Sequence, residues 1–212
     1  MEALRTQWAA YVGRQHQYPR GFVGQIIGQR MLRQHSPETE WSIELLRLQP
    51  TDWVLEVGFG AGRGLALSLE KAHQGRATGV DLSATMIQAA ARRNRTALEH
   101  GQLTLMRGNL AALPFGKAVF DKIFSIHTFY FWPEPRAVCL RLISLLAHGG
   151  RLVSTFATAR RLPNGEWNYW DVHRLAEALI TDFDQQPNLT ATLMNGQDSR
   201  HYNNVAIVID KA

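Results

Sequence analysis

From residue 51 onward the chain alternates short apolar runs with longer segments whose apolar residues recur at helical spacing. The short runs predict five strands, at 53–57, 77–81, 103–107, 122–126 and 151–156. The longer segments predict helices at about 62–73, 84–99 and 134–147. Alternation of this kind is typical of βαβ units, so we expect an α/β fold with a mostly parallel sheet covered by helices.

The last part of the chain has a different order of elements. Residues 170–183 have the pattern of a helix, and 189–194 and 205–209 have the pattern of strands joined by a polar loop. Two strands so closely linked in sequence are most simply an antiparallel hairpin. We therefore expect a seven-stranded mixed sheet, with parallel strands first and an antiparallel C-terminal hairpin last.

The first fifty residues predict an N-terminal helical cap over the mouth of the sheet. Two amphipathic segments, at about 2–14 and 22–34, precede a helix start at Ser36 and Pro37 with glutamates in the first turn. No repeat, low-complexity tract or linker interrupts the chain. We therefore expect one domain, 1–212, made of the cap (1–50), a core (51–156) and a C-terminal helix and hairpin (157–212).

Cysteine content and hydropathy indicate in which compartment the protein works and whether it enters a membrane. The one cysteine, Cys139, lies in an apolar-periodic segment, so no intrachain disulfide can form and we expect a reducing, cytoplasmic location. A buried thiol is a more economical reading of Cys139 than a reactive one. No window approaches the roughly 18 apolar residues that a membrane-spanning helix requires, so we expect no membrane insertion.

The charge of the chain permits several partners without selecting one. The formal net charge is +5 and the isoelectric point about 9.7, which would suit nucleic acid, an anionic surface or an anionic small molecule. The basic residues are scattered, however, and R-R-N-R at 92–95 is as dense as they become. The pattern favours a merely basic surface.

The stretch V-L-E-V-G-F-G-A-G-R-G, residues 54–64, is the strongest candidate for a binding site. Glycine so dense indicates unusual backbone angles or something that approaches the backbone closely. The stretch follows the first strand, where open α/β sheets bind ligands at a helix N-terminus. The dinucleotide pattern G-x-G-x-x-G fails, because its sixth position is Arg63 or Leu65. The alternative is that these glycines only form turns, in a fold that binds no ligand there.

The residues E-x-G-x-G-x-G (56–62) resemble motif I of the class I S-adenosylmethionine-dependent methyltransferases, which have a Rossmann-like fold. G-V-D-L-S (79–83) resembles their motif II, and R-G-N-L-A-A-L-P-F (107–115) is similar to the stretch that binds adenine. L-L-A-H-G-G-R-L-V (145–153) resembles the turn into their fifth strand. The resemblance covers 53–156 and is greatest to the ubiquinone/menaquinone-type small-molecule methyltransferases.

This resemblance implies S-adenosylmethionine as the cofactor and assigns residues to it. Asp81 would accept hydrogen bonds from both ribose hydroxyls, since a carboxylate offers only acceptors. Asn109 stands where the family usually has Asp, and its carbonyl would accept from the adenine amino group without charge assistance. The other residues implied to bind cofactor are Glu56, Gly58, Gly60, Gly62, Leu82, Met86, Leu110 and Ser125. Leu82 and Met86 would look the same as ordinary helix-facing apolar residues.

The resemblance also places the acceptor side at F-S-I-H-T-F-Y-F-W-P, residues 124–133. His127 is the candidate for a general base or an acceptor hydrogen-bond partner, because its usual pKa lies near neutrality. A histidine that only packs or caps a strand end is the equal alternative. Tyr130 and Trp132 could wall an aromatic substrate or simply cover the core. Tyr18, in the N-terminal segment, could belong to a lid over the substrate.

We therefore expect methyl transfer to an O, N or C nucleophile of a small molecule. Nucleic acid is the less favoured acceptor, because the N-P-P-Y type motif that stacks a flipped base is missing after the fourth strand. No cysteine pair or His/Asp cluster has metal-ligand spacing, so we expect no metal. An RNA methyltransferase and a non-catalytic S-adenosylmethionine-binding module are the alternatives, and the residues leave the oligomeric state open.

Overall fold

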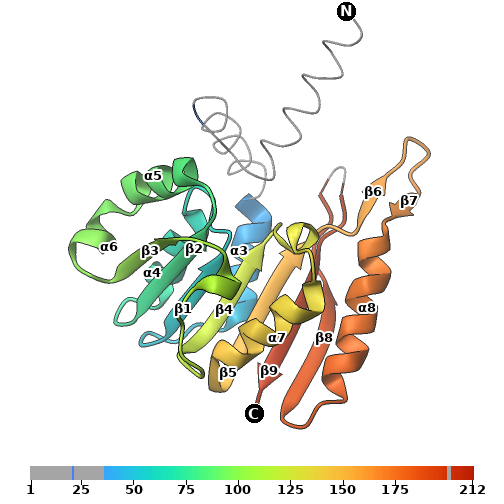
Figure 1. The fold of residues 1–212 in the computed structure, drawn as a ribbon. Helices are drawn as coiled ribbons and strands as arrows, with labels where there is room; N and C mark the ends of the chain where they lie inside the picture. Colours follow the sequence, from blue (N-terminus) through green and yellow to red (C-terminus); the bar gives the residue numbers. More distant parts are fainter. Residues whose placement is uncertain (1–20, 22–35, 200–201) are drawn as a thin grey trace, which may run out of the picture.

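The computed structural model describes Gly21 and residues 36–199 and 202–212 (Figure 1). A seven-stranded sheet lies at the centre, in the order β3-β2-β1-β4-β5-β9-β8. The strands are β1 (Trp53–Val57), β2 (Arg76–Asp81), β3 (Leu103–Arg107), β4 (Phe120–Ile126), β5 (Leu146–Phe156), β8 (Leu189–Asn195) and β9 (Val205–Lys211). The first five pair in parallel, and β9 pairs antiparallel with both β5 and β8. The predicted mixed sheet with its C-terminal hairpin is confirmed.

Helices cover both faces of the sheet. They are α3 (Ser36–Leu46), α4 (Arg63–Lys71), α5 (Ala84–Arg93), α6 (Arg95–Glu99), α7 (Pro135–Leu145) and α8 (Asp171–Asp184), with short 3₁₀ helices η1 (Leu110–Ala112) and η2 (Phe129–Phe131). Neighbouring strand residues point to opposite faces, so Leu55 and Ile123 join one buried cluster and Val54 and Phe124 the other. This two-sided burial explains why the central strands read as continuous apolar runs.

The helix predicted at 84–99 is divided in two by Asn94, which lies between α5 and α6. The Asn94 side chain donates hydrogen bonds to the carbonyls of Ala90 and Gly62, each at 3.0 Å. A side chain that bonds the backbone competes with helix continuation. The break therefore comes from a contact with the glycine loop, which local periodicity does not report.

A small hairpin of β6 (Ala159–Arg161) and β7 (Trp167–Tyr169) was not predicted. It stands beside the start of α8 and extends beyond the main sheet (Figure 1). The P-N-G sequence at 163–165 is its turn signal, and Gly165 has a positive φ of 90°. The strands are only three residues long, which is why no apolar alternation marks them.

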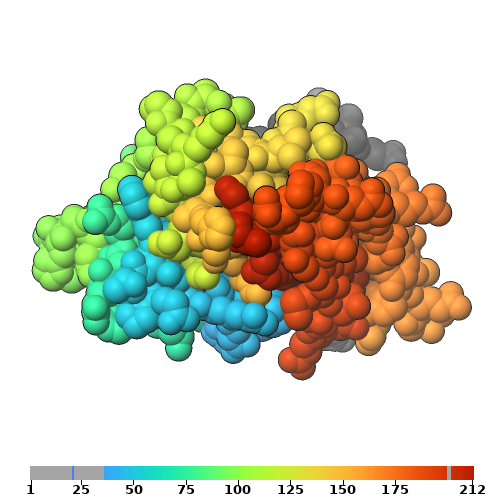
Figure 2. All heavy atoms as spheres, turned by 90° about the horizontal axis from the view of Figure 1, so that it is seen from below, coloured from blue at the N-terminus to red at the C-terminus, as the bar shows by residue number. Residues whose placement is uncertain are grey.

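The C-terminus lies at the end of the molecule opposite the carboxyl ends of the parallel strands (Figure 1). In the view from below, the last residues (dark red) lie between α8 (orange) and the α7–β5 segment (Figure 2). The Lys211 ammonium donates to the carbonyls of Ile143 (3.2 Å) and Leu146 (2.7 Å) at the end of α7. A cation at a helix C-terminus complements the helix dipole. Among the described residues, no helix is long and apolar enough to cross a membrane.

Candidate functional site

The loop after β1 needs glycine at two positions for different reasons. Gly58 has a φ of 74°, and a side chain there would overlap the Cγ2 methyl of Thr128. Its N–H donates to the Val80 carbonyl at 2.7 Å, which fastens the loop to β2. Gly60 has a φ of 51° but faces open space. Gly58 is thus required by close packing as well as by backbone angle, whereas Gly60 is required by backbone angle alone.

Glu56 is buried at the N-terminus of α4. Its carboxylate accepts the Leu65 N–H and fills the space that a side chain on Gly64 would need. Gly62, the N-cap of α4, offers no side-chain cap, so Glu56 serves that purpose from β1. Burial raises the Glu56 pKa well above its usual value, nearby Asp81 raises it further, and the Leu65 N–H opposes the rise. Glu56 Oε2 is buried without a hydrogen-bond partner among the described residues.

Asp81, at the end of β2, joins the glycine loop to α5. Its Oδ2 accepts the Gly60 N–H at 3.0 Å, and its Oδ1 accepts the Ser83 N–H at 2.8 Å. Ser83 in turn caps α5 by accepting the Met86 N–H. Burial raises the Asp81 pKa, and the backbone donors of Ser83, Gly60 and Leu82 oppose the rise. The carboxylate therefore lies at the junction of two loops with its position set by backbone groups.

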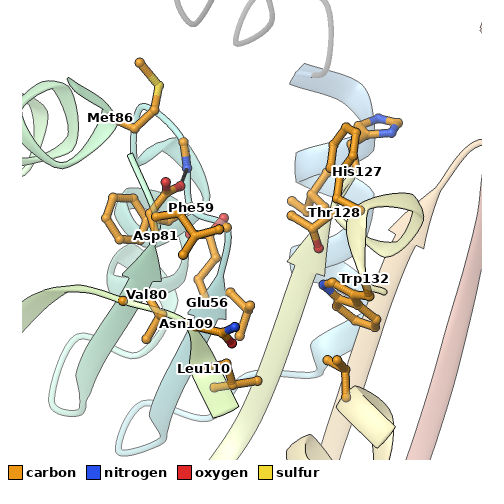
Figure 3. A pocket seen from close by; sticks show the side chains of 18 of the residues that line it. Glu56, Phe59, Val80, Asp81, Met86, Asn109, Leu110, His127, Thr128 and Trp132 are labelled. Carbon is orange, nitrogen blue, oxygen red and sulfur yellow. Dashed lines mark hydrogen bonds between the residues drawn. The ribbon is translucent and has the colours of Figure 1, made fainter. Parts of the chain in front are cut away.

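A cavity of about 470 Å³ lies at the carboxyl ends of β1, β2, β3 and β4. Figure 3 shows Glu56, Asp81 and Asn109 on one wall, and Thr128 and Trp132 on the wall opposite. Asn109 follows β3, and its Oδ1 accepts the Ala111 N–H at 3.0 Å, which caps η1. Apolar side chains complete the lining, namely Val57, Phe59, Val80, Leu82, Met86, Leu110, Ile126, Phe131, Trp132 and Val138.

His127 follows β4 and lines the cavity. It has a positive φ of 54°, which is uncommon for a residue other than glycine, and its N–H donates to the Thr155 carbonyl at 2.8 Å. Its Nδ1 lies 2.5 Å from the Tyr130 hydroxyl, which also accepts the Ala157 N–H at 3.4 Å. Tyr130 as a whole is 37% exposed, yet burial of the hydroxyl raises its pKa. The end of β5 thus holds the imidazole in place.

The structure brings together most of the residues that the sequence singled out. Those that line the cavity are Glu56, Gly58, Gly60, Asp81, Leu82, Met86, Asn109, Leu110, His127 and Trp132. Three others are not among the lining residues, because Gly62 packs on α5, Ser125 is buried against Ser154, and Tyr130 lies behind His127. Tyr18 lies outside the described residues.

Several residues at the site were missed from the sequence. Gly64 stood in the glycine run, which was a signal, but its reason is the Glu56 carboxylate. Thr39 of α3 lines the cavity, and neighbouring Glu40 pairs with Arg63, at the start of α4, at 2.6 Å. That pair is too exposed to contribute much stability. Helix α3 itself packs on the sheet against β4 and β5, and beside α4. Only tertiary structure brings α3 to this edge.

The donor and acceptor set of the cavity fits a nucleoside that carries an amino acid. Acceptors at Asp81 and Asn109 suit ribose hydroxyls and an adenine amino group, and apolar neighbours suit a ring. Glu56 Oε2 is an unsatisfied buried acceptor, so a cationic amine at this end would relieve its cost. The residues present therefore fit S-adenosylmethionine.

Comparison with known proteins agrees with this fit. A family model described as "Methyltransferase domain" matches residues 54–150. The chain is 26% identical over 130 residues to an uncharacterized methyltransferase, YdaC, of Bacillus subtilis, which covers 61% of this chain and 70% of that protein. It is 32% identical over 143 residues to a malonyl-[acyl-carrier protein] O-methyltransferase of Herminiimonas arsenicoxydans, covering 68% of this chain and 52% of that one. The chain thus spans about half the length of this second relative.

The fold has counterparts among solved structures. The geranyl diphosphate C-methyltransferase from Streptomyces coelicolor A3(2), in complex with Mg²⁺, geranyl diphosphate and S-adenosyl-L-homocysteine, superposes with a TM-score of 0.66. The match covers 85% of this chain and 80% of that chain at 17% sequence identity. At this identity the likeness shows a shared fold, and the residues of the site have to be argued from their own geometry.

Proposed function

Because this chain belongs to the class I S-adenosylmethionine-dependent methyltransferases, we propose that it transfers a methyl group to an O, N or C nucleophile of a small molecule. Its cofactor is S-adenosylmethionine. The observation that carries the proposal is the row of acceptors at the ends of three neighbouring strands, Glu56, Asp81 and Asn109, along one wall of one cavity. The closer kinship with the ubiquinone/menaquinone-type enzymes stays a prediction.

Each acceptor has a place in holding the cofactor. Asp81 would take the ribose hydroxyls, Asn109 the adenine amino group, and Glu56 Oε2 the ammonium of the amino acid portion. When bound, the cofactor supplies a methyl group on a sulfonium, which is already electrophilic. The chain then has to orient an acceptor and exclude water, and both tasks need position more than strong acid–base groups.

The acceptor side of the cavity contains His127, Phe131 and Trp132. Two aromatic side chains beside one imidazole suit an acceptor with apolar surface and a single protic group. His127 would receive the acceptor's proton or hold its hydrogen bond, since its usual pKa is near neutrality. Tyr130 acts through His127, because its hydroxyl contacts Nδ1 and it is not among the residues that line the cavity.

The first test of this proposal is cofactor binding measured by calorimetry. S-adenosylhomocysteine should bind the wild-type chain, and Asp81→Ala should raise its dissociation constant at least about tenfold, which is roughly 1.4 kcal/mol. Asp81→Asn keeps the shape and one acceptor, so it should lie between the two. Absence of binding to the wild type would overturn the assignment of the cavity, and an unchanged constant in Asp81→Ala would remove Asp81 from the site.

The second test is turnover with a metabolite extract, followed as S-adenosylhomocysteine release. His127→Ala should lower the rate far more than it lowers cofactor affinity, because His127 lies on the wall opposite the cofactor acceptors. Equal losses in rate and affinity would contradict an acceptor-side role. Cofactor binding without turnover on any extract would favour the non-catalytic binding module, and steeply salt-dependent binding to RNA would favour a nucleic-acid acceptor.

We also propose that the protein works in a reducing compartment such as the cytoplasm. Cys139 is a free thiol that is 1% exposed and packed among apolar residues of α7. Burial raises its pKa to about 12, so the group remains a thiol at neutral pH. The buried core role expected for Cys139 is confirmed, and a reactive role has no support from its surroundings.

A further inference from the structure

The C-terminal end of α5 binds the carbonyl side of the glycine loop. Arg93 Nε donates to the Ala61 carbonyl at 3.0 Å, and Asn94 Nδ2 donates to the Gly62 carbonyl at 3.0 Å. These are two consecutive residues of α5 and its cap bonded to two consecutive peptide groups of the loop. Ala61 lines the cavity, so this contact lies directly behind the proposed cofactor site.

Packing at the same place is close. A Cβ on Gly62 would lie 2.6 Å from Asn94 Nδ2 and 2.7 Å from the Cβ of Ala90, so only glycine lets α5 approach the loop. Asn94 is 6% exposed and interrupts what would otherwise be one helix over 84–99. Asparagine inside a helical run is unfavourable, and here the docking contact accounts for it.

The N-terminal end of α5 holds the other side of the loop. Asp81 accepts the Gly60 N–H and the Ser83 N–H, and Ser83 is the N-cap of α5. The loop therefore has hydrogen bonds to both ends of α5. The Gly60 N–H is bonded near the start of the helix, and the carbonyls of Ala61 and Gly62 are bonded at its C-terminal end. Because C=O and N–H point in opposite directions across a trans peptide, fixing the carbonyls toward α5 also fixes which way the amides at the start of α4 point.

We propose that Arg93 and Asn94 are positioning residues for cofactor binding, which hold the Gly58–Gly62 loop in its binding shape before the cofactor arrives. The inference rests on the proposed function for the identity of the ligand. A loop that is already ordered loses less conformational freedom on binding, and affinity rises accordingly. Arg93 belongs to the basic run R-R-N-R, and its bond to the Ala61 carbonyl gives it a specific role beyond making the surface basic.

The test compares Arg93→Ala with Arg92→Ala, its neighbour on α5. Both variants remove one exposed arginine from the same helix, but Arg92 makes no bond to the loop. In the ligand-free protein, hydrogen exchange of the loop amides should quicken in Arg93→Ala and not in Arg92→Ala. By calorimetry, the dissociation constant for S-adenosylhomocysteine should rise about threefold to tenfold in Arg93→Ala alone, as expected for the net contribution of one hydrogen bond.

Two further variants separate positioning from general stability. Arg93→Lys keeps a cation that can reach a carbonyl, so it should recover part of the affinity. Asn94→Asp keeps the shape of the side chain but loses the N–H donor. In this variant, hydrogen exchange of the loop amides should quicken more than that of the strand amides. Equal loop exchange in Arg93→Ala and Arg92→Ala would overturn the inference even if the cofactor binds. If the wild type bound no cofactor, the proposed function would fail, while the exchange comparison would still decide whether Arg93 orders the loop.

Discussion

Gly58, Gly62 and Gly64 lack side chains because three different neighbours occupy the space. Gly58 faces Thr128 from the end of β4, Gly62 faces α5, and Gly64 faces the Glu56 carboxylate. The missing side chains therefore let this segment pack closely against the end of β4, against α5 and against the Glu56 carboxylate. Of the three, Gly58 and Gly64 line the cavity, and Gly62 does not.

Gly58→Ala should destabilise the protein by about 1–3 kcal/mol, because the new methyl overlaps Thr128 as well as straining a positive φ. Gly101→Ala is the matched control, since Gly101 has a φ of 70° and open space around it. The free energy of unfolding of both variants, measured with denaturant, gives the packing contribution as the difference between their two losses. Equal losses would mean that backbone strain alone requires glycine at position 58.

The bond between Tyr130 and His127 predicts a kinetic effect without a binding effect. Tyr130→Phe removes one hydroxyl partner of Nδ1 while keeping the ring, so turnover should fall about threefold to tenfold, the usual worth of one hydrogen bond. The acidic limb of the rate–pH profile should move, because the imidazole loses a partner. The dissociation constant for S-adenosylhomocysteine should not change. A rise in that constant with an unmoved pH profile would place Tyr130 on the cofactor side instead.

At the scale of elements, helix α4 depends on a residue from another element. Its N-cap is a glycine without a side-chain bond, and Glu56 of β1 supplies an acceptor for the Leu65 N–H. The arrangement places a carboxyl group in a buried position, where ionisation is unfavourable. The hydrogen bond from Glu56 stabilises the N-terminus of α4, and burial of the carboxyl group opposes that gain.

This arrangement predicts a pH dependence of stability. A Glu56 pKa raised on folding means that the folded state retains a proton that the unfolded chain has already lost. Stability therefore falls as pH rises from the usual glutamate value, 4.5, through the raised value. Glu56→Gln keeps an acceptor for Leu65 without the charge, so its stability should fall less over that range. Parallel unfolding curves for the two proteins from pH 4.5 to 8 would contradict the prediction.

Element boundaries were predicted well where periodicity is local. The structure places β1 and β3 at the predicted residues, and α4, α7 and α8 within a few residues of the predicted ends. The prediction was wrong where one element touches another. Helix 84–99 breaks at Asn94 because of the glycine loop, and β5 begins at Leu146 because it pairs with Phe120 across an irregular register.

At the scale of the whole molecule, the sheet order explains where the cavity lies. From β1 the chain proceeds to β2 on one side, and β4 lies on the other side of β1. The crevice at such a change of direction is where open α/β sheets bind ligands, and the cavity lies at that edge. The row of acceptors follows from this topology, because Glu56, Asp81 and Asn109 each lie at or just beyond the carboxyl end of a strand, on the same edge of the sheet.

Cofactor binding should therefore stabilise the whole fold. At a concentration one hundred times its dissociation constant, S-adenosylhomocysteine should add about 2.7 kcal/mol, which raises Tm by roughly 5–10 °C for a chain of this size. NAD at the same concentration should give no such shift, since the glycine loop lacks the dinucleotide pattern. Thermal unfolding with both ligands is the measurement. A larger shift with NAD would contradict the assignment of the cavity.

The sequence by itself determined the order of the helices and of the seven strands of the main sheet after residue 50, and the position of the glycine loop, because these depend on local periodicity and on residue type. The acceptors at the strand ends came from the resemblance of their motifs to those of a known family. Tertiary structure alone decided which candidates reach the cavity. Ser125 is turned to Ser154 by the pairing of β4 with β5, Gly62 meets α5, and Tyr130 meets His127. The direction of these side chains depends on partners far away in the sequence, and no local pattern encodes those contacts.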